Sequence, residues 1–428
     1  MSVATTFRAL QHPNYRLFFA GQMISLVGTW MQSVAQSWLI YRLTGSAALL
    51  GAVGFAGQFP VFLLASLGGI VADRYNRRRV LIATQTAAML LAAALAALTL
   101  SGHVHEWHVF VLAAMLGLVN AIDIPARQAF VVELVERKDF MNAIALNSAM
   151  FNGARVAGPA LAGVLVASIG EGWCFLVNAL SYLAVIAGLW RMRVESRGVP
   201  SRASSGLADL LEGFRFAWRT EPIRMLLLSL GLVSLVGMPY TVLMPIFADQ
   251  ILHSGARGLG ILMGASGLGA LIGALALAAR TELRGLGRWV ALSMAGFGGG
   301  LVAFSLSRSF WLSTALLLPV GTCMMVEMSA SNTLIQAMVP DRLRGRVMAI
   351  YSMMFMGLAP AGALLAGSLA ERLGAPQIVA AGGLLAMLGA LAFSVRVRAL
   401  APAARRLIAA QVAAGEPRAE EGRGPRVA

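Results

Sequence analysis

Two carboxylates interrupt long apolar stretches of this sequence at corresponding places. Asp123 follows Trp107, and Glu327 follows Trp311, with the second pair displaced from the first by 204 residues. If these stretches span a bilayer, a charge near its middle costs about 2.5 to 3.5 kcal/mol on insertion scales, so each acid requires a reason. The chemistry open to such a carboxyl is the uptake and release of a proton, which can couple energy to movement.

The local surroundings of the two acids differ. Asn120, Asp123 and Arg127 share one face of a predicted helix, so a cation lies one turn from Asp123 and favours its charged form. Asp123 is therefore predicted to be a gate or a structural ion pair. Glu327 has no basic residue within one turn. Burial disfavours its charged form unless another helix supplies a cation, and we prefer Glu327 as the protonation site over a merely hydrogen-bonded buried acid.

Arg155 is a third charge inside an apolar run. Gly153, Gly158 and Gly163 surround it and permit close helix contact, while Pro159 bends the axis. Arg155 is a candidate partner for either acid in proton coupling, or a binder of an anionic substrate. A structural charge that extends toward the interface is the equally weighted alternative.

The first apolar run carries a polar stripe, which indicates the lining of a cavity. Gln22, Ser25, Thr29, Gln32 and Gln36 recur at steps of three and four. Hydrogen bonding between helices is the alternative, but such bonds average only about 0.6 kcal/mol, so a stripe this long favours contact with water or substrate. Further lining candidates lie on other runs: Asn147, Asn152, Asn178, Tyr240, Asn332 and Gln336.

The elements that must position these residues are membrane-spanning helices. Of the 428 residues, 58% are hydrophobic and only 12% are charged, and the mean hydropathy is +0.75, which is too apolar for a soluble domain. About twelve runs, from 17–41 to 376–395, each reach the roughly 20 residues that a spanning helix needs. None shows the alternation of a transmembrane barrel, so we predict an all-α membrane protein.

The chain repeats itself, and the repeat predicts its domains. The offset that relates Asp123 to Glu327 also relates Ala145 to Ala349 and Ser148 to Ser352. We expect two pseudo-symmetric six-helix bundles around a central cavity, related by an axis along the membrane normal. The predicted units are 1–191, a cytoplasmic linker with an amphipathic helix at 192–222, 223–398, and a disordered cytoplasmic tail at 399–428.

Basic residues indicate the orientation. The net charge is +15, but the arginines come in short bursts between apolar runs, which does not fit a nucleic-acid-binding surface. Sixteen basic residues fall in loops on one side and four on the other, which places both termini and the linker in the cytoplasm. The run after Arg16 is too long for a signal peptide, so we expect it to remain as a membrane helix.

The segment 69–79 is a charged hairpin between the second and third runs. Its residues Gly69, Asp73, Arg74, Arg77 and Arg78 match Gly-x-x-x-Asp-Arg-x-x-Arg-Arg, and the hairpin resembles a loop of the major facilitator superfamily. In that family the loop is a cytoplasmic gate, which is what the resemblance implies here. A positive-inside anchor is the alternative, although an anchor alone does not need Asp73. Gly69 is expected to let two helices approach closely.

Three further segments narrow the resemblance. Segments 123–130, 142–148 and 158–163 look like the branch of that superfamily that includes the enterobactin exporter, and Gly158, Pro159 and Gly163 are similar to the packing motif of the family's exporters. The resemblance implies a bacterial inner-membrane secondary transporter that exports a siderophore, drug or metabolite in exchange for protons. An importer, a carrier of lipid-like substrates and a transport-inactive sensor remain alternatives. We expect a monomer without cofactor, and no metal set or catalytic constellation indicates an enzyme.

Overall fold

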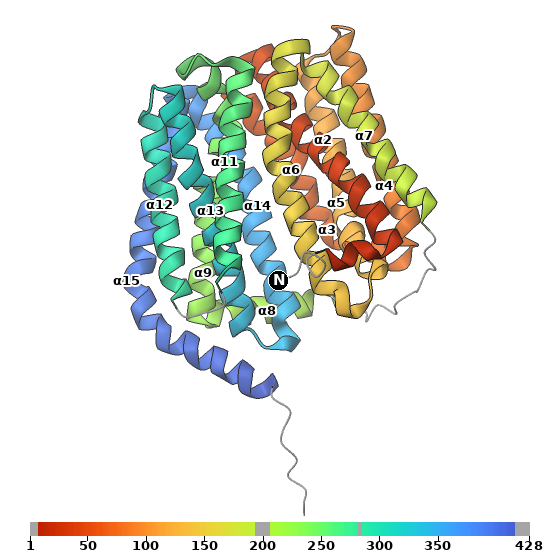
Figure 1. Cartoon of the computed structure of the whole chain (residues 1–428). Helices are drawn as coiled ribbons and strands as arrows, with labels where there is room; N and C mark the ends of the chain where they lie inside the picture. The colour runs from red at the N-terminus through yellow and green to blue at the C-terminus, as the bar shows by residue number, and fades with distance from the viewer. Residues whose placement is uncertain (1–6, 193–205, 281–284, 416–428) are drawn as a thin grey trace, which may run out of the picture.

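The computed structural model describes residues 7–192, 206–280 and 285–415, and within them the chain is helical without strands. Long helices that follow one another in the chain run in opposite directions (Figure 1). Their bounds are α2 Pro13–Thr44, α3 Ala47–Arg74, α4 Arg77–Leu100, α5 Glu106–Leu134, α6 Phe140–Ile169, α7 Glu171–Arg191, α8 Gly206–Arg219, α9 Glu221–Leu232, α10 Tyr240–Ile246, α11 Gly255–Ala278, α12 Leu286–Leu306, α13 Phe310–Met338, α14 Asp341–Leu373 and α15 Ala375–Gly415. Short helical turns are η1 Arg8–Gln11, η2 Arg137–Asp139, η3 Val233–Gly237 and η4 Phe247–Ile251.

The described residues contain 11 helices long and apolar enough to cross a membrane, so the protein is a multi-pass membrane protein. The helix that falls outside this group is α2, whose 32 residues are long enough to span a bilayer. The glutamines and serines of the polar stripe lower the mean hydropathy of α2. For that reason α2 is not among the 11 apolar helices. The sequence prediction of about twelve runs therefore differs from the apolar count by this one helix.

One predicted span is not a regular helix. The run 225–247 is divided in the structure into α9, η3, α10 and η4. In η3 the Met238 amide donates to the Val233 carbonyl at 3.0 Å, and in η4 the Leu252 amide donates to the Phe247 carbonyl at 2.9 Å, so both turns are wider than α-helical turns. Pro239 and Pro245 lie between them and offer no amide hydrogen, which explains why the helix does not continue regularly.

The two sequence halves, α2–α7 and α9–α15, repeat the same helix contacts. In the first half α3 packs on α5 and α4 packs on α7, and in the second half α11 packs on α13 and α12 packs on α15. If α9 to η4 is counted as one span, α3 and α11 are the second spans of their halves, and α5 and α13 are the fourth. In the same way α4 and α12 are the third spans, and α7 and α15 are the sixth. The duplication read from isolated residues is thus also present in the packing.

The halves meet mainly through two helix pairs, α3 with α14 and α6 with α11. Figure 1 shows α6 beside α11 in the middle of the molecule. A Cβ atom added at Gly163 would lie 2.8 Å from Gly260 Cα, and one added at Gly367 would lie 3.0 Å from Gly51 Cα. These contacts are near the C-terminal ends of α6 and α14 and the N-terminal ends of α11 and α3. Small residues therefore join the halves at the end of the bundle opposite the hairpin 69–79.

Two side-chain contacts between the halves lie at the same end. The Tyr41 hydroxyl donates to Asp249 Oδ2 at 2.8 Å. Glu371 Oε2 accepts from the Ser46 hydroxyl and from the Ala48 amide, each at 3.1 Å. A carboxylate of the second half thus caps the N-terminus of α3 in the first, which is a favourable place for a negative charge.

The predicted amphipathic helix of the linker is confirmed as a helix, α8, whereas linker residues 193–205 lie outside the described residues. Glu212 pairs with Arg342 at 3.0 Å and also with Arg346, so α8 is held against the start of α14. Leu211, Phe214 and Trp218 remain exposed. Exposed apolar side chains on a helix beside the bundle are typical of contact with a membrane surface.

The predicted disorder of 399–428 is wrong for its first part. Helix α15 continues to Gly415, with Pro402 inside it, and its last part turns beneath the second half (Figure 1). Ala404, Leu407 and Ile408 pack against the core at that end, so these spaced apolar residues have a partner surface. The prediction failed because they repeat too briefly to indicate a helix alone. Residues 416–428 lie outside the described residues.

The glycine contact between the halves gives the first test. Gly163→Val should lower the thermal unfolding temperature of the purified protein, because overpacking at a close contact costs about 1 to 3 kcal/mol. Gly153→Val on the same helix is the matched control, since a Cβ there has no neighbour within 4 Å. Equal loss of stability in the two variants would contradict this account of the interface.

Candidate functional site

Asp123 lies at the centre of a buried polar network that joins three helices. One carboxylate oxygen accepts from the Thr84 hydroxyl at 2.8 Å and from the Gln85 amide at 2.9 Å, both on α4. The other oxygen pairs with Arg127 Nε at 3.3 Å, one turn along α5. Arg127 donates in turn to Gln22 Oε1 of α2 at 3.3 Å. The predicted contact between Asp123 and Arg127 is confirmed, and the charged carboxylate has a compensating partner for each oxygen.

Glu327 is fully buried and has far fewer partners. Its Oε1 accepts from the Ser331 hydroxyl at 3.4 Å, and its Oε2 has no hydrogen-bond partner. Within the described residues no basic side chain lies within 4.0 Å of the carboxyl group. Ser331 occupies the repeat position that Arg127 holds in the first half. The two related acids therefore differ in compensation, because one faces an arginine and the other faces a serine.

Arg155 lies on α6 where the two halves meet. Its guanidinium carbon is 5.7 Å from the centre of the Trp30 ring on α2, and its Nη2 is 3.9 Å from the Met324 sulfur on α13. A Cβ added at Gly267 of α11 would lie 2.8 Å from the Arg155 carbonyl oxygen, so the backbones are close as well. Of the partners that the sequence left open, neither Asp123 nor Glu327 pairs with Arg155 in this arrangement of the described residues.

Much of the polar stripe on α2 faces other helices of its own half. Gln22, Ser25 and Gln32 are buried, and Gln32 Oε1 accepts from the Asn178 amide of α7 at 2.6 Å. The Thr29 hydroxyl donates to the Ser25 carbonyl at 2.9 Å. Interhelical and local hydrogen bonds, the alternative that the sequence left open, account for Gln32 and Thr29, whereas Gln22 Nε2 is buried without a partner. Gln36 is partly exposed.

The remaining lining candidates are divided between satisfied and unsatisfied groups. The Tyr240 hydroxyl shares a 2.6 Å hydrogen bond with Ser266, and Asn152 donates to the Ser148 carbonyl at 2.9 Å. Asn332 accepts from Gln336 on the same helix. Asn147 is different, because its Oδ1 is buried without a partner. Buried oxygens without partners are costly, so Asn147 Oδ1 and Glu327 Oε2 are positions where a ligand, a water molecule or a proton would be favourable.

The predicted gate hairpin is organised within the first half. Arg77 pairs with Glu133 of α5 at 2.7 Å and with Asp73 at 3.2 Å, and Arg78 donates to the Leu189 carbonyl at the end of α7 at 2.6 Å. Arg74 is exposed. These contacts fix the turn between α3 and α4 onto α5 and α7. A gating role for the hairpin remains a prediction.

The expectation for Gly69 is wrong by one residue. A Cβ added at Gly69 has no neighbour within 4 Å, whereas one added at Gly68 would lie 3.0 Å from Ile122 Cα of α5. Gly68 is therefore the position that allows α3 to approach α5. In the packing motif of α6, Gly158 faces Met31 of α2, and Gly163 faces α11. Pro159 is buried between them.

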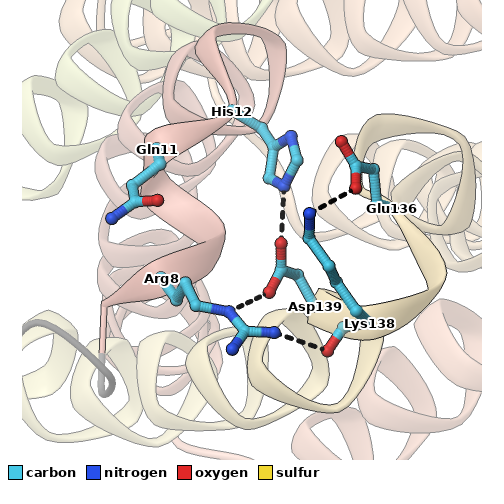
Figure 2. Close-up of a pocket in the computed structure, with 6 residues that line it drawn as sticks. All are labelled: Arg8, Gln11, His12, Glu136, Lys138 and Asp139. Carbon is cyan, nitrogen blue, oxygen red and sulfur yellow. Dashed lines mark hydrogen bonds and ion pairs between the residues drawn. The ribbon is translucent and has the colours of Figure 1, made fainter.

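A separate polar hollow of about 520 Å³ lies beside η1. Figure 2 shows Asp139 between Arg8 and His12. The His12 Nε2 atom is 2.9 Å from Asp139 Oδ2, and Asn142 accepts from the Ala9 amide at 2.8 Å. The charges of the hollow are paired with one another, so these contacts anchor the N-terminal segment to the start of α6 and leave little unmet charge for a substrate.

Sequence reasoning missed Thr84 and Gln85, which supply two of the hydrogen bonds to Asp123. The available signal was the run Thr84, Gln85 and Thr86 inside an otherwise apolar helix. It also missed Ser331 as the one donor to Glu327, although the repeat offset from Arg127 would have found it.

Comparison with known proteins adds a family and several relatives. The family model described as transmembrane secretion effector matches residues 4–420. The staphyloferrin A transporter of Staphylococcus aureus (strain NCTC 8325 / PS 47) is 26% identical, over 84% of this chain and 90% of that protein. The multidrug efflux pump Tap of Mycolicibacterium fortuitum is 28% identical, over 81% of this chain and 87% of that protein. The enterobactin exporter EntS of Shigella boydii serotype 4 (strain Sb227) is 26% identical, over 84% of this chain and 85% of that protein.

Solved structures show the same fold at low identity. The nucleoside transporter NupG superposes with a TM-score of 0.71 at 14% identity, over 89% of this chain and 98% of that chain. A bacterial homologue of the iron transporter ferroportin in an inward-facing state gives 0.65 at 17% identity, over 89% and 98%.

The unequal surroundings of the two acids predict unequal responses to neutralisation. Asp123→Asn removes the charge that Arg127, Thr84 and Gln85 satisfy, and should cost about 1.5 to 3 kcal/mol, the range for hydrogen bonds to a charged group. Glu327→Gln removes no ion pair and should cost less than about 1 kcal/mol. Thermal unfolding of both purified variants should rank them in that order, and the reverse ranking would contradict the assignment.

Proposed function

We propose, from the premise that the chain belongs to the transmembrane secretion effector family of major facilitator superfamily transporters, that it exports a small organic molecule in exchange for protons. In this proposal α2 also spans the membrane and raises the number of spans from 11 to twelve. Helices α2–α7 and α9–α15 then form two six-helix bundles. The protein acts as a monomer in the bacterial inner membrane. Small-molecule transport follows from the family, whereas proton coupling and direction are what we propose.

The observation that carries proton coupling is the difference between the repeat-related acids. Asp123 is paired with Arg127. Glu327 is fully buried, lacks a cation among the described residues, and has one oxygen without a partner. An isolated buried carboxyl is most stable when protonated and becomes charged only if water or a cation reaches it. Movement of the two halves that changes access to Glu327 would therefore change its proton occupancy.

Export is supported by what the relatives are named for. Tap is named as a multidrug efflux pump and EntS as an enterobactin exporter. We extend outward transport to this chain on that similarity. Siderophores, drugs and other metabolites are the cargo classes that these relatives suggest.

Alternating access requires contacts between the halves that can break. The paired glycines, the hydrogen bond between Tyr41 and Asp249, and the cap that Glu371 gives to α3 all lie at one end of the molecule. By the positive-inside rule this end is the outer one, so the arrangement supports an outer gate in its closed state. Hydrogen bonds at a partly exposed interface exchange readily with water, which makes this gate reversible.

Proton coupling can be tested in proteoliposomes that contain a trapped pH dye. A panel of siderophores and antibiotics should reveal a substrate that changes the internal pH with wild-type protein. Glu327→Gln should abolish that pH change but retain exchange of the substrate down its own gradient, because neutralisation removes only the proton site. Glu106→Gln, at the exposed acid that begins α5, is the control. Unchanged coupling in Glu327→Gln would remove Glu327 from the mechanism.

The proposed orientation has its own test. A fluorescent protein fused to the C-terminus should fluoresce in bacterial cells, and alkaline phosphatase fused there should be inactive, because the distribution of basic loops favours a cytoplasmic position for both termini. Phosphatase fused after Arg308, in the opposite set of loops, should be active. Active phosphatase at the C-terminus would invert the topology and with it the outer gate.

A further inference from the structure

Arg155 is the one intramembrane charge that the proposed coupling does not use. Its surroundings come from both halves, with Trp30 on α2 of the first half and Met324 on α13 of the second. The Arg155 side chain is largely buried at this junction of the two halves. A charge held at the junction of two moving halves is well placed to meet a cargo that both halves contact.

The guanidinium is under-satisfied as a hydrogen-bond donor. An arginine has five N–H donors, and in the described part of the chain its contacts are the Met324 sulfur, a weak acceptor, and the Trp30 ring. The two intramembrane acids do not relieve it, since Asp123 is occupied by Arg127 and Glu327 is not within ion-pair distance. A buried charge with unmet donors is costly, and an anion from outside the protein would remove that cost.

The rest of the site favours an aromatic or apolar body next to the anion. Trp30 also packs edge-on against Phe151, with ring centres 5.7 Å apart, and Phe151 is exposed one turn from Arg155. A planar guanidinium binds a carboxylate through two parallel hydrogen bonds and leaves the adjacent rings free to stack. An ammonium-bearing cargo would instead be repelled by Arg155.

We propose that Arg155 is an anion subsite, and that the cargo presents a carboxylate or a similar delocalised oxyanion beside an aromatic or apolar body. The inference rests on the proposed transport function and specifies its substrate class. Arg155 binds the anionic group, and Trp30 and Phe151 contact the body. Glu327 handles the proton separately, one turn beyond Met324 on α13.

The test is equilibrium binding of two small probes that differ in charge. Salicylate carries a carboxylate on an aromatic ring, and salicylamide is its neutral counterpart. Full-length protein fused to a fluorescent protein would be heated with each probe and analysed by size-exclusion chromatography. Salicylate should raise the unfolding temperature of the wild type by several degrees, and salicylamide should leave it unchanged.

Variants assign the effect to the guanidinium. Arg155→Gln should abolish the shift caused by salicylate, and Arg155→Lys should reduce it, because a lysine keeps the charge but loses the planar pair of donors. Arg16→Gln, at an exposed arginine near the start of α2, should retain the full shift. Equal stabilisation by the two probes, or a full shift in both Arg155 variants, would overturn the subsite.

A second measurement separates this site from an ion pair between Arg155 and Glu327 in another conformation. Without ligand, the changes in unfolding temperature of Arg155→Gln and Glu327→Gln should add in the double variant, and strong coupling between them would overturn the proposal. Salicylate binding is measured without a proton gradient. If salicylate does not bind, the anion subsite is wrong, but the result on proton coupling in proteoliposomes still stands. A failure of proton coupling likewise leaves the salicylate result intact.

Discussion

The cost of keeping a charge away from water governs the interior of this protein. Asp123, Glu327 and Arg155 are charged residue types inside the helical bundle, and each meets that cost differently. Asp123 has an arginine and two hydrogen-bond donors, so its charge is permanently compensated. Glu327 has one serine and no cation within reach in the described chain. Arg155 cannot become neutral, and it lies beside an aromatic ring at the junction of the halves.

Duplication explains how such different solutions arose in equivalent places. The same helix pairings recur in the two halves, and the acids occupy related positions on α5 and α13. A single exchange between arginine and serine, at 127 and 331, separates a structural ion pair from an isolated carboxyl. Strict symmetry would give both halves the same response to a proton. The asymmetry leaves one acid paired with an arginine and the other without a cation among the described residues.

The contacts between the halves complement these charges. Glycines on α3, α6, α11 and α14 bring backbones together without interlocking side chains, so the halves can separate without large repacking. The hydrogen bonds between the halves at the same end, from Tyr41 to Asp249 and from Ser46 to Glu371, fix how the halves are oriented but are few. A transporter needs an interface of this kind, because a large interlocking one would hold a single state.

The sequence by itself determined the membrane class, the all-helical spans, the internal repeat, the contact between Asp123 and Arg127 and the lack of a local cation at Glu327, because composition, spacing and contacts within one helix are local properties. Only the tertiary structure decided that Gly68 rather than Gly69 is the close contact, that Gln32 faces Asn178, that Arg155 meets Trp30 rather than an acid, and that α15 extends to Gly415. Each of these depends on how a helix is rotated about its axis and which neighbour it faces. That rotation is set by packing between residues far apart in the chain, which periodicity along one helix does not contain.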